Sequence, residues 1–350
     1  MRGALRTWLA GVLSGTLLSL SGCGGGTPVP DITPPISVNS GSSSPPSIFQ
    51  QDTVRIGVKN NQPGTSMQTP THGWIGFDVL LGEQLVRRLG KPGIDPPRFG
   101  DVTSGEREAV LTSGGEDLVI ASYSITPKRT DVVYFAGPYA TTYQGFLVHA
   151  GDAWLNSLDD LKGRTVCSWG GTTSQDELVL QSQVKGYTVM SKTDAESCRV
   201  ELEEHRADAV STDQLILYGL ANAFPGLAVA PKVTIGVPNV YGVGIKKERY
   251  EDCLRIRDFL KGYVFSSDWL QDFRNSLPTA GKPESYLPKP TDIDAMSCKA
   301  LPHQDQVVQA PTPSETPVPS ESATPTESAT ATPTPTESAT PTASAAPNES

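Results

Sequence analysis

One stretch of the sequence, Asp117 to Arg129, constrains the fold more than any other. It reads DLVIASYSITPKR: an apolar run from Leu118 to Ala121, a turn rich in hydroxyl groups, and then Pro127 and Arg129. An apolar run of this length between turn residues is typical of a buried strand, and Pro127 prevents it from continuing as a ladder-bonded strand. We therefore expect the hydroxyl groups and the arginine at the carboxyl end of a strand.

The carboxyl end of a strand is where small ligands bind in open α/β sheets. A guanidinium suits a carboxylate there, because its planar fork of N–H groups matches the two oxygen atoms. We therefore interpret Arg129, Ser124 and the backbone around Ser122 as an anion-binding cluster for a small carboxylic acid. The alternative is a sheet strand followed by a solvated turn, with Arg129 as a surface charge.

Patterns typical of strands and helices alternate along the chain. Thr53 to Lys59 alternates like a strand, Gly76 to Gly90 carries an apolar helical face, and Glu106 to Ser113 leads as a helix into the central strand. A second series of strands and helices follows from Arg164 to about Asp213. This β-α-β rhythm predicts an α/β fold with mainly parallel sheets and helices on both faces.

These motifs resemble, in the same order, those of the amino-acid-binding proteins of ABC importers, in particular the branch for acidic amino acids. In that family the strand D-x-x-I-A-[ST]-x-[ST]-I-T-x-x-R delivers hydroxyls and an arginine to the ligand's α-carboxylate. The match runs roughly from Thr53 to Leu287. The resemblance implies a two-lobed periplasmic-binding-protein-like fold of type II, in which each lobe is a mainly parallel sheet flanked by helices, a two-strand hinge joins the lobes, and the ligand lies in the cleft.

The division of the chain follows from this interpretation. About 250 residues are enough for two lobes, each with its own core. We expect lobe 1 at residues 52–142 and 240–300 and lobe 2 at residues 143–239, with crossings near Tyr139 to Gln144 and Gly236 to Tyr241.

The chain begins with Arg2, Arg6, a short apolar stretch and then Leu20-Ser21-Gly22-Cys23. This pattern predicts a lipoprotein signal peptide over residues 1–22, with Cys23 as a lipidated first residue carrying acyl chains such as palmitate. A plain signal peptide is the alternative. We expect an extracytoplasmic protein, tethered to the outer face of the cell membrane by this lipid, because no later apolar stretch is long enough to cross a bilayer.

Two segments of biased composition flank the lobes. Residues 23–51 are rich in Gly, Pro and Ser, which predicts a flexible linker. Residues 301–350 form a tail rich in Pro, Thr, Ser and Ala, with too few large apolar groups to offset the entropy of ordering, so we expect it to be disordered. The Thr and Pro content is compatible with O-glycosylation or with an unmodified spacer.

Four cysteines remain once Cys23 is set aside, and an exported protein tends to oxidise them. Of the three pairings, we favour Cys167 with Cys198 and Cys253 with Cys298, because each pair is local and falls within one predicted lobe. A zinc site is the alternative, but neither C-x-x-C nor paired-histidine spacing is present.

Charge and motifs exclude several classes of function. The net charge of −10 and the absence of basic runs argue against nucleic acid as a partner. The four histidines are scattered, and the sequence lacks G-x-S-x-G, H-E-x-x-H, P-loop and G-x-G-x-x-G motifs. We therefore expect no catalytic residue, no metal and no cofactor, and a monomeric protein.

The resemblance assigns further ligand contacts to the second lobe. Thr172 and Thr173, in a glycine-containing turn that opens a helix, would hold the same carboxylate as Arg129, since free N–H groups at a helix start attract anions. Asp213 occupies the family's position for the ligand's ammonium group. Both sites have a structural alternative, because threonine and aspartate are also common helix N-caps. Trp169 replaces a lysine or small residue found in some relatives and would wall the cleft.

Two further cations would set selectivity. Lys59 stands where binders of acidic ligands carry a cation, and Arg107 lies in T-S-x-x-R, similar to the motif of glutamate and aspartate binders whose arginine meets the side-chain carboxylate. Either alone is also compatible with a surface charge, or, for Arg107, with a partner in Glu106 or Glu108. With Arg129, three cations would surround a ligand with two carboxylates and one ammonium, which favours glutamate or aspartate.

Three functions compete at this stage. The first is a lipid-anchored binding protein that hands glutamate or aspartate to an ABC permease. The second is a sensor of the same fold that signals amino-acid availability to a membrane partner. The third, an enzyme, requires a positioned acid or base in the cleft, which the sequence does not indicate.

Overall fold

The computed structural model of this 350-residue chain describes residues 45–152 and 154–303. The predicted signal peptide, Cys23, most of the linker and nearly all of the tail lie outside the described residues. Their roles stay predictions.

One nine-stranded sheet organises the described chain. It runs in the order β5-β1-β6-β12-β7-β10-β8-β9, and β11 pairs with β7 in addition. Two groups of three parallel strands lie at its ends: β5 (Arg98–Asp101), β1 (Arg55–Val58) and β6 (Leu118–Val119) at one end, and β10 (Ala209–Asp213), β8 (Thr165–Trp169) and β9 (Thr188–Lys192) at the other. The mainly parallel α/β architecture expected from the sequence is confirmed.

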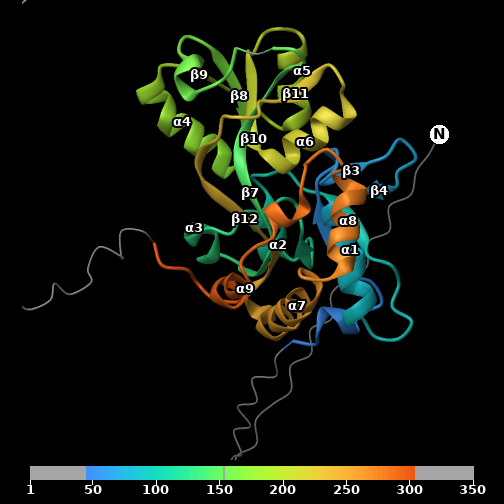
Figure 1. Cartoon of the computed structure of the whole chain (residues 1–350). Helices are drawn as coiled ribbons and strands as arrows, with labels where there is room; N and C mark the ends of the chain where they lie inside the picture. Colours follow the sequence, from blue (N-terminus) through green and yellow to red (C-terminus); the bar gives the residue numbers. More distant parts are fainter. Residues whose placement is uncertain (1–44, 153, 304–350) are drawn as a thin grey trace, which may run out of the picture. The chain divides into compact units, whose positions relative to one another are not determined.

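Two long strands connect these groups. Strand β7 (Tyr134–His149) and strand β12 (Ile235–Ile245) pair antiparallel, with Thr142 opposite Asn239 and Ala140 opposite Tyr241. In Figure 1, both strands run between two parts of the molecule. One part contains β8 to β11 and α4 to α6, and the other contains the remaining labelled helices. This pair corresponds to the predicted two-strand hinge. Strand β7 begins at Tyr134, before the crossing expected near Tyr139 to Gln144. The exact lobe boundaries stay a prediction.

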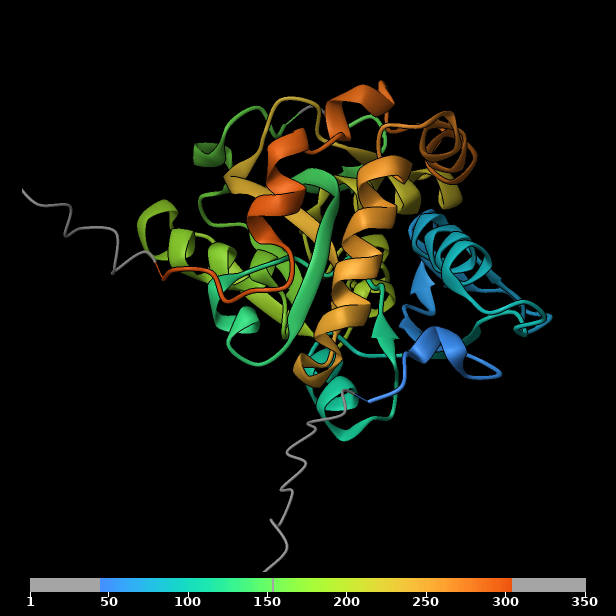
Figure 2. The same cartoon turned by 90° about the horizontal axis from the view of Figure 1, so that it is seen from below.

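Helices pack on both groups of strands. The first group carries helices from both ends of the folded chain: α1 (Phe77–Leu89), α2 (Arg107–Ser113), α3 (Pro127–Thr130), α7 (Tyr250–Tyr263), α8 (Ser267–Ser276) and α9 (Pro290–Met296). The second carries α4 (Thr173–Lys185), α5 (Ala195–Glu203) and α6 (Gln214–Ala223). Helices α7 and α9 pack on β7, which is followed most easily in Figure 2 as orange helices beside the green strand.

The sequence patterns missed several short elements. Residues 61–75 form a small antiparallel sheet of β2 (Asn61–Gln62), β3 (Ser66–Gln68) and β4 (Trp74–Ile75). Strands β5, β9 and β11 (Leu227–Val229) and helix α9 were also not anticipated, nor were the 3-10 turns Ile48–Gln50, Lys247–Arg249 and Pro283–Tyr286. Segments of two to five residues carry too few side chains to establish a periodic pattern.

The folded part begins earlier than the sequence predicts. The linker was expected to extend to Gln51, but Ile48 and Phe49 are fully buried in the core of the first group of strands. Asp252 in α7 holds this segment, because its carboxylate accepts hydrogen bonds from the Ser47 hydroxyl and from the backbone N–H of Ile48. The linker prediction is therefore wrong for residues 47–51.

Two disulfides crosslink the described chain. Cys167 is bonded to Cys198 and Cys253 to Cys298, with Cα atoms 5.6 and 5.8 Å apart. Both pairings predicted from the sequence are thus confirmed. The first joins β8 to α5, and the second joins α7 to the segment that follows α9.

The described residues contain no group of histidine, cysteine, aspartate and glutamate side chains that could hold a metal ion. Within the same ranges, the helices are all too short or too polar to pass through a bilayer.

Candidate ligand-binding site

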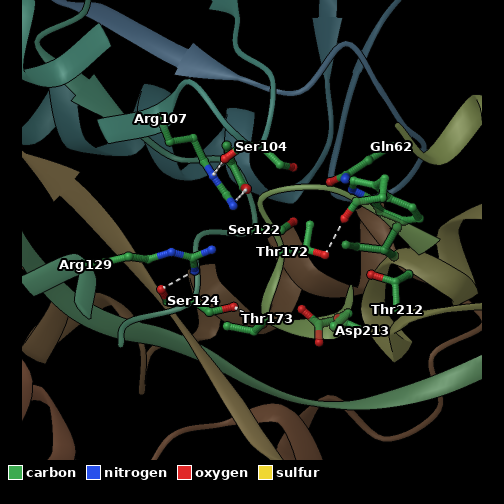
Figure 3. Close-up of a pocket in the computed structure, with 14 residues that line it drawn as sticks. Gln62, Ser104, Arg107, Ser122, Ser124, Arg129, Thr172, Thr173, Thr212 and Asp213 are labelled. Atoms are coloured by element: carbon green, nitrogen blue, oxygen red, sulfur yellow. Dashed lines mark hydrogen bonds between the residues drawn. The ribbon is translucent and has the colours of Figure 1, made fainter. Parts of the chain in front are cut away.

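A small polar cavity lies where the two groups of strands meet (Figure 3). It is lined by residues from both groups, including all the predicted ligand-binding residues except Lys59: Arg107, Ser122, Ser124, Arg129, Thr172, Thr173 and Asp213. Its volume in this structure is about 10 Å³, which is room for about one water molecule. The carboxyl ends of β6, β8 and β10 all lead into it, as expected for a ligand site in an open α/β sheet.

Arg129 points into this cavity rather than into solvent. Thr126 caps the short helix α3 by accepting a hydrogen bond from the Arg129 N–H at 3.3 Å, and Pro127 occupies the first helical position. The Arg129 side chain is 11% exposed. Its Nη1 donates to the Ser124 carbonyl at 2.7 Å and its Nη2 to the Gly171 carbonyl at 3.0 Å. The interpretation of Arg129 as a surface charge is therefore wrong.

Arg107 is the first residue of α2 and is also buried, with 3% exposure. Its guanidinium donates to three backbone carbonyls, those of Ser104 at 3.0 Å, Ala121 at 3.3 Å and Gly171 at 2.8 Å. Burial, together with the smaller effect of the Arg129 charge, lowers the pKa of Arg107 to about 10. The suggested partners Glu106 and Glu108 do not bind it; Glu108 pairs with Arg129 instead, at 3.4 Å.

Gly171 is the point at which both arginines meet the second group of strands. Its carbonyl accepts one hydrogen bond from each guanidinium. A side chain is excluded here, because a Cβ atom would lie 2.7 Å from the Gly105 nitrogen and the Gly171 φ angle is +74°.

Tyr123 supports both guanidinium groups. The Cζ atoms of Arg107 and Arg129 lie 4.5 and 5.0 Å from the centre of its ring, within the range of cation–π attraction. Phe135 packs edge-on against the ring at 4.6 Å, and Gly244 leaves room for it, since a Cβ atom there would approach the ring to 2.9 Å. Tyr123 was not among the site residues predicted from the sequence.

Asp78, another residue missed from the sequence, holds the turn at Ser122. Ser122 has a left-handed φ of +46°, which is unusual for a residue other than glycine. Its N–H donates to Asp78 Oδ2 at 2.8 Å, and the Tyr139 hydroxyl donates to Asp78 Oδ1 at 2.7 Å. The backbone N–H of Ser122 is therefore already bonded and does not face a ligand, contrary to the expectation. The sequence signal that could have identified Asp78 is that it is an acidic residue within the apolar face of the helix at 77–89.

Hydroxyl groups from the two groups of strands face each other in the cavity. Ser124 Oγ lies 3.3 Å from Thr173 Oγ1. Thr172 is the N-cap of α4, since its hydroxyl accepts from the Gln175 N–H at 3.1 Å, and it also donates to the Trp169 carbonyl at 2.7 Å. Thr172 is thus both the helix cap and part of the cavity lining.

Asp213 supplies the carboxylate of the cavity. It ends β10, is 4% exposed, and accepts hydrogen bonds from Asn239 Nδ2 and the Tyr241 hydroxyl, both at 2.7 Å. Burial raises the pKa of Asp213, although the hydrogen bonds from these two side chains of β12 act to lower it. Although Asp213 precedes α6, its side chain makes no capping bond. The alternative of a structural N-cap is therefore wrong for this side chain.

Lys59 lies outside this cavity, in an adjoining one that shares Gln62, Ser104 and Trp169 with it. Its Nζ donates to the Val102 carbonyl at 2.7 Å. The two cavities are lined in addition by residues that the motifs did not indicate, among them Gln62, Ser104, Ser174, Thr212 and Ile216. Trp169 lines the cleft as expected.

Comparisons with known proteins give a consistent result. The sequence profile of the bacterial extracellular solute-binding proteins, family 3, matches residues 54–307. The glutamate-binding protein GluB of Corynebacterium glutamicum is 30% identical over 211 residues, which are 58% of this chain and 71% of that protein. The ABC transporter glutamine-binding protein GlnH of Bacillus subtilis is 29% identical over 203 residues, 57% of this chain and 72% of that protein.

Solved structures share the fold. An ancestral arginine-binding protein bound to arginine superimposes with a TM-score of 0.58 and 25% identity, covering 65% of this chain and 98% of its own. A solute receptor for L-cysteine of Neisseria gonorrhoeae has a TM-score of 0.61 and 23% identity, covering 69% and 98%. The two-lobed fold expected from the motifs is that of these amino-acid-binding proteins.

Asp78 is expected to make stability depend on pH. Burial raises its pKa from an ordinary value of about 4 to about 6. Between these values the folded chain retains a proton that the unfolded chain has released, so this group's contribution to the free energy of unfolding falls as pH rises, by about 3 kcal/mol in all. Urea unfolding of the wild type and of Asp78→Asn at pH 4, 5, 6 and 7 measures this. The advantage of the wild type over the variant should shrink by that amount; a pH-independent difference would contradict the assignment.

Replacing Tyr123 tests the support of the arginines. Tyr123→Leu removes the ring beneath both guanidinium groups and its contact with Phe135, which should lower the free energy of unfolding by about 2 to 4 kcal/mol. The matched control, Tyr123→Phe, keeps the ring and should stay within about 1 kcal/mol of the wild type. Urea unfolding of the three proteins gives the answer, and equal stability of the two variants would contradict it.

Proposed function

Because the chain belongs to the bacterial extracellular solute-binding proteins, family 3, and is therefore a binding protein rather than an enzyme, we propose that it captures glutamate or aspartate by closure of its two lobes and delivers it to an ABC importer. The observation that carries this proposal is the presence of Arg107, Arg129 and Asp213 around one small cavity.

The charges of the site complement an acidic amino acid. Arg107 and Arg129 line the cavity and Lys59 lies next to it, against the single carboxylate of Asp213. Glutamate and aspartate carry two carboxylates and one ammonium group at neutral pH. Glutamine lacks the second carboxylate and would leave more of this positive charge uncompensated.

Both arginines keep donors for a ligand. A guanidinium has five N–H groups, one on Nε and two on each terminal nitrogen. In Arg107, each of the three nitrogens donates to one carbonyl, which leaves one N–H on each terminal nitrogen. Arg129 likewise uses one N–H on each terminal nitrogen. Each arginine can therefore still present a fork to a carboxylate.

We assign roles on this basis. Arg129, Ser124, Thr172 and Thr173 bind the α-carboxylate, with Ser122 in the wall beside them, and Asp213 binds the ammonium group. Arg107 meets the side-chain carboxylate, and Lys59 adds positive charge from the adjoining cavity. The glutamate-binding relative supports this choice of ligand, and the glutamine-binding relative defines the competing one.

Delivery to an importer is supported by the relatives, one of which is named for an ABC transporter. In this proposal the protein is monomeric and is held at the outer face of the cell membrane by acyl chains on Cys23. The permease then receives the ligand when the lobes open.

Calorimetry tests the ligand and the role of Arg129. We expect glutamate or aspartate to bind more tightly than glutamine and asparagine. Arg129→Lys keeps the charge but loses the fork, and should weaken glutamate binding by about 10- to 100-fold, the value of a charge-assisted hydrogen bond. Arg274→Lys, at an exposed position with 59% side-chain exposure, is the matched control and should bind like the wild type. Glutamine binding at least as tight as that of glutamate would refute the proposed selectivity.

Uptake separates transport from sensing. Deletion of the gene in the organism that carries it should lower the initial rate of labelled glutamate or aspartate uptake, and the wild-type gene should restore it where the Arg129→Lys gene does not. A sensor that signals to a membrane partner would leave uptake unchanged in the deletion strain, and that result would replace the transport proposal.

A further inference from the structure

A second polar cavity lies beside the ligand cavity. Its volume is about 100 Å³, against about 10 Å³ for the first, and it shares Gln62, Ser104 and Trp169 with it. Its own lining includes Lys59, Asn60, Asn61, Asp101, Thr103 and Asp194. The proposed function uses this space only as the source of one positive charge.

Lys59 is a buried cation with donors to spare. It is 5% exposed, and its Nζ makes one hydrogen bond, to the Val102 carbonyl. An ammonium group has three donors, and no carboxylate of the described chain lies within 4 Å of this one. Burial lowers the pKa of Lys59, and the charge of Arg107 adds to this effect. Buried lysines are normally paired, so this one is suited to an anion brought by a ligand.

The two acidic residues of the second cavity are already engaged. Asp101 Oδ1 accepts a hydrogen bond from the Asn60 N–H at 3.2 Å. Asp194 is the N-cap of α5, where its carboxylate accepts from the Ser197 N–H at 2.8 Å. Their negative charge offsets that of Lys59 at a distance, while the remaining Lys59 donors stay open.

Trp169 lines both cavities and is held firmly in place. It ends β8, where it is paired with Lys192 of β9, and its carbonyl accepts from the Thr172 hydroxyl at 2.7 Å. Its side chain is 1% exposed and belongs to a core cluster with Cys167, Ala195 and other residues. A side chain fixed on so many sides cannot swing aside to admit a longer ligand.

We propose that Trp169 limits the length of the acidic amino acid that this protein accepts, and that the cavity beyond it is an extension of the site in which Lys59 binds the distal carboxylate of a longer dicarboxylic amino acid once Trp169 is made smaller. This inference rests on the proposed function. It assigns to Trp169 the role of a specificity-determining residue, and to the Lys59 cavity a chemical class of ligand.

Calorimetric titration of glutamate, 2-aminoadipate and 2-aminopimelate tests the inference. The wild type should bind glutamate best. In Trp169→Ala, the affinity for 2-aminopimelate relative to glutamate should rise by about tenfold or more, the range for one or more methylene groups admitted to a pocket. Trp169→Phe should show a smaller rise in the same direction. Adding Lys59→Met to Trp169→Ala should abolish the gain, whereas adding Lys232→Met, at an exposed position, should preserve it.

Each outcome bears on a different part of the inference. If the Trp169 variants bind glutamate without any relative gain for the longer acids, or if the wild type already binds 2-aminopimelate as tightly as glutamate, Trp169 is not the barrier, and the proposed function still stands. If the relative gain for 2-aminopimelate persists after Lys59→Met is added, Lys59 does not bind the distal carboxylate. If circular dichroism shows that Trp169→Ala does not fold, Trp169→Phe decides. A wild type that binds none of the acidic amino acids, aspartate included, refutes the proposed function and this inference together.

Discussion

Two guanidinium groups held side by side in a buried polar cavity are the interaction on which the rest of this site depends. Like charges repel and lose hydration on burial, so their proximity must be compensated. Compensation comes from backbone carbonyls, from the face of the Tyr123 ring and from the Glu108 carboxylate beside Arg129. These groups lower the cost of the pair without neutralising it, which leaves a positive site for an anionic ligand.

The Gly171 carbonyl joins this pair to the second group of strands. Both arginines belong to the first group of strands, whereas Gly171 follows β8 of the second. The hydroxyl contact between Ser124 and Thr173 crosses the same boundary. The two groups of strands therefore meet through polar contacts at the ligand cavity. Polar contacts of this kind are readily exchanged with water, which suits the lobe closure of the proposed function.

In the proposed function, selectivity is distributed between charge and shape. The arginines and Asp213 would recognise the ends of the amino acid, while Trp169 would limit the space beyond them. The separation has a physical basis, because charge acts over several ångströms and is tolerant of position, whereas the wall of a close-packed core is not. In this proposal, Lys59 in the adjoining cavity would influence the potential of the site from a space that glutamate does not enter.

The sequence by itself determined the α/β class, the order of the long elements, both disulfides and most of the residues around the cavity. It did so because buried strands, amphipathic helices and the D-x-x-I-A-S-x-S-I-T-x-x-R motif are local patterns that can be recognised without knowledge of the fold. Only the tertiary structure decided that Asp78 holds Ser122, that Tyr123 lies under two arginines, that Asp213 is bound by β12, and that Lys59 and Trp169 line a second cavity. Ser122 and Asp78 are 44 residues apart, and Tyr241 and Asp213 are 28 apart. Contacts between such distant residues arise from strand order and packing, which no local spacing encodes.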